Sequence, residues 1–296
     1  MRQADGVPSL ISSPAGLLRV EVDGPATADV VVLSAGLGGG WFDWPAVVRL
    51  LAADLRVVCF DRPGTGDSGP ALAPPSLARE VAVLDAVLDA VGAPRAVLVG
   101  HSIAGLHVEG YARLRPERVA GAVLLDPSPE PPGVGRPFDG EAVFARMLLA
   151  FGRVPGMRRL GRALAGWSGP ASRRSVLRTG SHTHREVAPL DRIEAVYRRP
   201  EVIGAILDEL AAYPDLVAEL EAVRAGHPLP ELPWLVLTAA QALGKPRQAR
   251  RILACHARLA RLVPGGAHEL VQRCGHMMPL DRPDTVAEAV RRVKGV

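Results

Sequence analysis

A serine at the junction of a strand and a helix is the first residue whose setting suggests chemistry. Ser102 lies in GHSIAG, with Gly100 and Ala104 two positions to either side. The preceding AVLVG predicts a buried strand, and the residues that follow predict a helix. Small flanking residues permit a sharp turn that lifts a nucleophilic serine above a sheet. The alternative is that Ser102 is an ordinary helix N-cap.

A serine hydroxyl is a poor nucleophile unless a base takes its proton, so a second residue is required. His276 lies in RCGHMMPLDRP, directly after the last apolar segment and before the last helical one. His256 and His268 do not follow a strand end, and the histidines beside Ser102 are too near it along the chain. His276 is therefore the predicted base.

The elements that would position these two residues alternate along the first half of the chain. Apolar or alternating runs predict strands at 17–22, 30–35, 57–61, 96–100 and 121–126. Segments with one apolar face predict helices between them. Successive strands joined by helices imply a parallel sheet with helices on both faces.

This alternation stops after residue 126. From Pro127 to about Pro230 the sequence predicts only helical segments, set among Pro, Gly and Arg. Strands resume at 234–239 and 268–274, and a closing helix is expected from about Pro283. We therefore predict one core domain, residues 1–126 and 231–296, interrupted by a helical insertion at 127–230.

Together these pieces resemble the α/β-hydrolase fold family. AGLGGGW, FDRPGTGDS, GHSIAG and GHMMPLDRPDTV occur in the family's order, and the resemblance covers about residues 17–293. It implies an α/β fold with an eight-stranded, mostly parallel sheet flanked by helices, and a mainly helical cap or lid formed by the insertion. It also implies a nucleophile at Ser102 and a base at His276.

The acid of the expected triad departs from the family pattern. The family's usual acid follows the seventh strand, here LVLTAAQALG, but no Asp or Glu occurs from residue 232 to 268. Some members carry the acid after the sixth strand instead, which corresponds to Asp126 at the end of GAVLLD. Glu130 in the same loop is the alternative acid. Asp126 could also serve only as a loop cap at the strand end before Pro127.

The glycine-rich loop departs from the family as well. Relatives commonly have His-Gly where this chain has Ala35-Gly36. By correspondence, the backbone N–H groups of Leu37 and Ile103 would form the oxyanion hole, which backbone donors can supply without that histidine. The neighbouring Trp41 and Phe42 are expected to line the substrate pocket together with the cap.

The resulting hypothesis is a serine hydrolase that cleaves an ester, thioester or similar acyl bond of a small molecule. A second hypothesis is an acyltransferase, thioesterase or cyclase acting on a carrier- or coenzyme A-bound substrate. It draws on the segment 142–185, which has nine arginines and no acidic residue and could face an acidic carrier; solvated arginines on exposed helices are the simpler interpretation. A third is a non-catalytic ligand-binding member of the fold.

Composition excludes several other classes. The 296 residues are 48% hydrophobic and 22% charged, which is typical of a soluble globular protein. No apolar run is long enough to span a membrane, and the N-terminus lacks the apolar core of a signal peptide, so we expect a cytoplasmic location. The low aromatic content (4%) and absence of a recognition motif argue against nucleic acid. We expect no metal and no organic cofactor.

Overall fold

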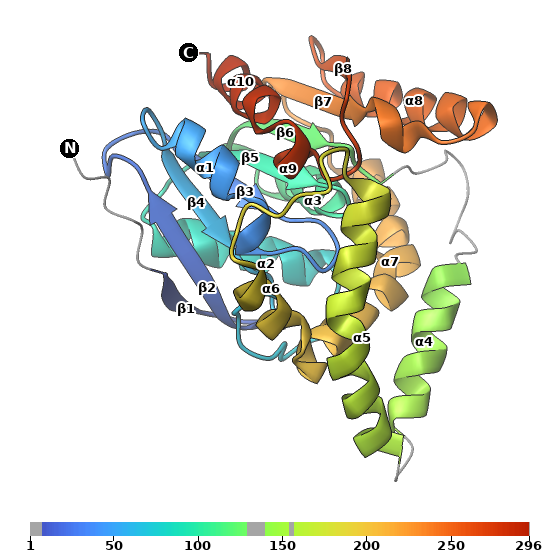
Figure 1. The fold of residues 1–296 in the computed structure, drawn as a ribbon. Coiled ribbons are helices and arrows are strands. Elements are labelled where there is room, and N and C mark those ends of the chain that lie inside the picture. Colours follow the sequence, from blue (N-terminus) through green and yellow to red (C-terminus); the bar gives the residue numbers. More distant parts are fainter. Residues whose placement is uncertain (1–7, 129–139, 154–156, 296) are drawn as a thin grey trace.

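The computed structural model describes residues 8–128, 140–153 and 157–295. Eight strands form one sheet in the order β1-β2-β4-β3-β5-β6-β7-β8 (Figure 1). Their bounds are β1 Ser9–Ser13, β2 Gly16–Asp23, β3 Val30–Ser34, β4 Arg56–Phe60, β5 Ala96–His101, β6 Val119–Leu125, β7 Trp234–Ala239 and β8 Ala267–Val271. β2 pairs antiparallel with both β1 and β4, and every other neighbouring pair is parallel. This confirms the predicted eight-stranded, mostly parallel sheet.

Helices cover both faces of the sheet. α1 and α10 pack on one face, and α2, α3 and α8 pack on the other. Their bounds are α1 Pro45–Leu51, α2 Leu77–Ala90, α3 Ala104–Leu114, α8 Pro246–Ala260 and α10 Pro283–Lys294, with the short α9 Met278–Asp281 before α10. Ser76 caps α2, because its side chain accepts a hydrogen bond from the Arg79 N–H at 3.1 Å.

Four helices are described between β6 and β7 in the chain, and we call them the cap helices. They are α4 Gly140–Arg153, α5 Met157–Gly180, α6 Leu190–Tyr197 and α7 Pro200–Gly226. In Figure 1 they stand beside the sheet as a separate layer, with α4 and α5 running next to each other. The segment predicted to contain only helices therefore contains only helices among its described elements.

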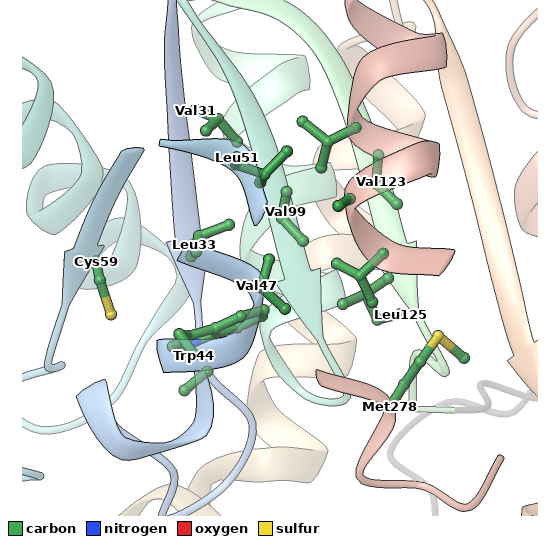
Figure 2. Packing of buried hydrophobic residues seen from close by; sticks show 14 of the residues in the cluster. Val31, Leu33, Trp44, Val47, Leu51, Cys59, Val99, Val123, Leu125 and Met278 are labelled. Carbon is green, nitrogen blue, oxygen red and sulfur yellow. The ribbon is translucent and has the colours of Figure 1, made fainter. Parts of the chain in front are cut away.

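The central strands are buried because parallel strands in this fold have helices on both sides. Every residue of β5 is buried, and Val99 and Val123 of adjacent strands pack with Val47 and Leu51 of α1 (Figure 2). Burying side chains of this size stabilises the fold by about 1.5–3 kcal/mol each. The strand ends that carry the candidate residues are thus fixed by a rigid core.

Most strand ends lie within two residues of their predicted positions, but three elements differ in other respects. β1 was not predicted, because this edge strand is short and largely exposed. β8 ends at Val271 rather than at 274, and Arg273 adopts a positive φ of 50° just beyond it. α3 begins at Ala104 and its N-cap is Ile103, so Ser102 is not the cap residue of that helix, contrary to the alternative interpretation of this serine.

Candidate active site

Ser102 occupies a strained turn between β5 and α3. Its φ is 55°, in the left-handed region that residues other than glycine rarely adopt. A Cβ on Gly100 would lie 2.6 Å from the carbonyl oxygen of Ala104, so the turn requires glycine at position 100. The N–H of Ser102 donates to the Leu125 carbonyl at 3.0 Å, which ties the turn to β6. Strain held by such contacts is characteristic of functional residues.

The structure brings Ser102, His276 and Asp126 into one hydrogen-bonded chain. His276 Nε2 lies 3.0 Å from Ser102 Oγ, and His276 Nδ1 lies 2.7 Å from Asp126 Oδ2. The three residues follow β5, β8 and β6, and these strand ends meet at the same edge of the sheet. This is the arrangement of nucleophile, base and orienting acid.

Asp126 is fixed by contacts beyond His276. Its Oδ1 accepts the Ala239 N–H at 3.0 Å, and its own N–H donates to the Leu237 carbonyl at 2.7 Å. Asp126 is buried and has a positive φ of 42°, so it too is held in an unfavourable backbone conformation. The end of β7, where relatives usually carry the acid, instead donates a backbone N–H to this carboxylate. The alternative acid, Glu130, lies outside the described residues.

The backbone N–H groups predicted to form the oxyanion hole are those of Leu37 and Ile103. Leu37 lies in the loop after β3, and Ile103 directly follows Ser102. In the described part of the chain, neither N–H has a protein acceptor. Ile103 also lies at the N-terminus of α3, where the helix dipole favours negative charge.

A cavity of about 330 Å³ lies beside Leu37 and Ser102. Ser102 and His276 form one wall, and Val176 and Ile206 of the cap helices contribute to the other. Additional lining residues include Gly36, Leu37, His101 and Met277. The volume suits a small organic molecule.

Trp41 and Phe42, expected to line this cavity, are not among the described residues that do so. Both belong to the short 3-10 turn Trp41–Asp43, and both side chains are buried in the core beside α1. The Trp41 N–H donates to Asp61 Oδ1 at 2.7 Å, which directs the turn toward the sheet. Asp43, the third residue of the turn, is the one that faces the cavity.

Comparison with known proteins agrees with this geometry. The profile described as "Alpha/beta hydrolase family" matches residues 30–289, which is most of the chain. The chain belongs to the alpha/beta hydrolase family.

Curated relatives of the chain include proteins named "Putative carbamate hydrolase RutD". The protein of that name from Variovorax paradoxus is 42% identical over 116 residues, which cover 37% of this chain and 42% of the relative. The chain thus spans less than half the length of that relative. A protein of the same name from Caulobacter sp. is 27% identical over 278 residues, covering 93% of this chain and 94% of the relative.

Solved structures show the same fold. Cfl2 from Burkholderia cenocepacia superposes with a TM-score of 0.75 at 23% identity, covering 96% of this chain and 94% of Cfl2. A thermophilic esterase from Thermogutta terrifontis superposes with a TM-score of 0.67 at 22% identity, covering 97% of each chain. Identities this low support the fold of the chain and nothing finer.

Arg173 of α5 is a cavity residue that the sequence did not reveal. Its Nη2 donates to Asp43 Oδ1 at 2.7 Å, and its Nε donates to Glu186 Oε1 at 2.7 Å. Burial alone would lower the pKa of Arg173, but the two carboxylates raise it well above its ordinary value. The sequence does not distinguish Arg173, because it is one of nine arginines in the acid-free segment 142–185.

Two further residues position the loop that carries His276. His101 Nε2 lies 2.7 Å from the His276 carbonyl oxygen, and burial with the nearby His276 lowers the pKa of His101 to about 4. His101 is therefore neutral at pH 7, with a proton on Nε2 to donate. Asp281 accepts the Gly275 N–H at 2.8 Å and the Ser181 hydroxyl at 2.6 Å, so it joins this loop to the end of α5. Burial would raise the pKa of Asp281, but these hydrogen bonds and those from 182–183 lower it.

The arginine-rich segment is partly neutralised by acids from other parts of the chain. Besides Arg173, Arg146 pairs with Asp215 at 3.0 Å and Arg174 pairs with Glu194 at 2.7 Å. These pairs reduce the positive charge that we considered a docking surface for an acidic carrier. Within residues 8–128, 140–153 and 157–295, no helix is long and apolar enough to cross a membrane.

Proposed function

We propose that this hydrolase cleaves an ester, thioester or similar acyl bond of a small molecule through an acyl-enzyme. The observation that carries the proposal is the hydrogen-bonded chain Ser102–His276–Asp126, whose serine and histidine open into the cavity. The core would comprise 1–126 and 231–296, and the insertion at 127–230 would serve as the cap.

The proposed mechanism uses each group where it lies. His276 Nε2 takes the proton of Ser102 as Oγ attacks the carbonyl carbon, and Asp126 holds the Nδ1 proton of His276 and stabilises the imidazolium. The N–H groups of Leu37 and Ile103 stabilise the oxyanion. The leaving group departs with the proton from His276. Water, activated by the same histidine, then attacks the acyl-enzyme and releases the acid and Ser102.

The charges beside the cavity favour a neutral substrate. Arg173 is the cap cation at the cavity, and it already faces two carboxylates, those of Asp43 and Glu186. An anionic substrate would therefore find no unpaired guanidinium there and would be repelled by the excess negative charge. Carbamate chemistry, which the names of the relatives suggest, fits this site when the carbamate is a neutral ester.

We expect a neutral acyl group to be hydrolysed at least about tenfold faster than an anionic one of similar length, a difference of about 1.4 kcal/mol. The measurement is kcat/KM for a valerate ester and for a hemisuccinate ester of the same alcohol. In Asp43→Asn, which removes one of the carboxylates, the ratio of the two rates should narrow. Equal or faster hydrolysis of the hemisuccinate by the wild type would contradict the assignment.

We expect a fluorophosphonate probe to label the wild type at one site per chain. The activated Oγ of Ser102 would displace fluoride and form a stable phosphonyl ester. Intact-mass measurement should show one adduct, and peptide mapping should locate it on Ser102. Ser102→Ala is the matched control and should not be labelled. An unlabelled wild type, or labelling that persists in Ser102→Ala, would refute the proposed nucleophile.

A further inference from the structure

The loop that carries Leu37 is fastened by residues of the cap helices. We infer that Tyr197, and Arg62 held by Glu209, position the oxyanion hole, so that the hole is complete only while the cap helices are seated. The inference rests on the proposed serine hydrolase function. It names positioning residues, which act through the loop and do not touch the reacting atoms.

Tyr197, the last residue of α6, holds one side of the loop. Its hydroxyl donates to the Gly38 carbonyl at 2.7 Å, and Gly38 directly follows Leu37. The Tyr197 ring is buried against Phe42, with ring centroids 5.8 Å apart, so the hydroxyl has little freedom to move. Gly38 has a positive φ of 67°, and this hydrogen bond fixes the peptide in that conformation.

Arg62 holds the other side of the loop. Its Nη2 donates to the Gly36 carbonyl at 2.8 Å, and its Nη1 donates to the Ala35 carbonyl. Glu209 of α7 receives both Nε and Nη2 of the same guanidinium, at 2.8 and 2.9 Å. Burial alone would lower the pKa of Arg62, but Glu209 raises it above its ordinary value. Because the planar guanidinium of Arg62 is hydrogen-bonded to Glu209 and to the loop carbonyls at the same time, it holds the loop in a fixed position relative to α7.

The two contacts flank Leu37, whose N–H is the predicted oxyanion donor. Tyr197 binds the carbonyl of Gly38, the residue after Leu37. Arg62 binds the carbonyls of the two residues before Leu37. A third cap contact comes from Ile206, whose Cδ1 lies 3.0 Å from where a Cβ on Gly38 would be. Relatives commonly place a histidine at the position of Ala35, which lacks a polar side chain. Tyr197 and Glu209 of the cap helices thus add to the anchorage that Arg62 of the core gives this loop.

The test is Tyr197→Phe, which removes the hydroxyl and keeps the ring. We expect kcat for a small ester to fall by about 10- to 100-fold with little change in KM, because small displacements of catalytic donors carry costs of this order. The inhibition constant of a trifluoromethyl ketone should rise by a similar factor. Its hemiketal with Ser102 places an oxyanion in the same hole, so a change in the folded fraction alone would not shift it.

Arg224→Gln is the matched control. Arg224 also joins α7 to the core, through an ion pair with Glu109 at 2.6 Å, and Glu109 lies in α3 rather than in the oxyanion loop. This variant should lower the melting temperature while leaving kcat and the inhibition constant within about twofold of the wild type. A fall in kcat equal to that of Tyr197→Phe would show a general effect of cap docking and overturn the assignment to Tyr197.

Glu209→Gln tests the contact of Arg62 with the loop, and it does so independently if Tyr197→Phe fails to fold. It retains an acceptor for Arg62 and weakens its charge pairing, so kcat and ketone affinity should again fall together. Unchanged kcat and ketone affinity in either folded variant would overturn the inference. Failure of the proposed function looks different, because the wild type would then neither react with a fluorophosphonate nor bind the ketone.

Discussion

Replacing either Ser102 or His276 with alanine should lower kcat for a small ester by about a millionfold, and replacing both should lower it no further. The serine attacks only as its proton moves to the histidine, so each residue is inactive without the other. Their atoms are already within hydrogen-bond distance, with Ser102 Oγ 3.0 Å from His276 Nε2. Replacing one of the two residues therefore removes the same chemical step as replacing both.

Steady-state hydrolysis of a p-nitrophenyl ester, corrected for the uncatalysed rate, measures this effect. His227→Ala is a suitable control, because His227 is exposed at the end of α7 and does not line the cavity. Its kcat should equal that of the wild type. Additive losses in the Ser102→Ala, His276→Ala double variant would show that the two residues act in separate steps, and would contradict the proposed mechanism.

The sequence predicted Ser102 and His276 because each depends on a local pattern. About a dozen neighbouring residues encode the strand, the sharp turn with small residues and the helix. The turn at Ser102 has the strained backbone conformation that this pattern predicts. His276 follows the last strand in the same local way. Parallel strands then place both residues at one edge of the sheet without further information.

The sequence could not predict the role of residues whose function depends on how deeply the side chain is buried, or on contacts between distant parts of the chain. Trp41 and Phe42 were expected at the pocket because they adjoin the glycine-rich loop, but apolar residues in a tight turn also pack into the core, and these two do. Arg173 meets Asp43 across 130 positions, and Tyr197 meets Gly38 across 159. Such pairs between insertion and core leave no periodic signal, so only the folded chain shows them.

The strongest test of the unusual acid is Asp126→Asn, which should lower kcat by about 10⁴-fold with little change in KM. The Asn carbonyl oxygen can still accept the Ala239 N–H, as Asp126 Oδ1 does at 3.0 Å. Its amide would then present N–H groups to His276 Nδ1. Nδ1 must become an acceptor, so the imidazole proton moves to Nε2, where the histidine can no longer take a proton from Ser102.

Glu130→Gln distinguishes this acid from its alternative. If Asp126 orients His276, kcat of Glu130→Gln should stay within about threefold of the wild type, whereas Asp126→Asn loses most of its activity. The reverse pattern would assign the acid to Glu130 and leave Asp126 as a strand-end cap. Circular dichroism and the melting temperature of both variants provide the folding control. A strand-end cap would change stability, whereas an acid that sets the tautomer of the base must change kcat even when the fold is intact.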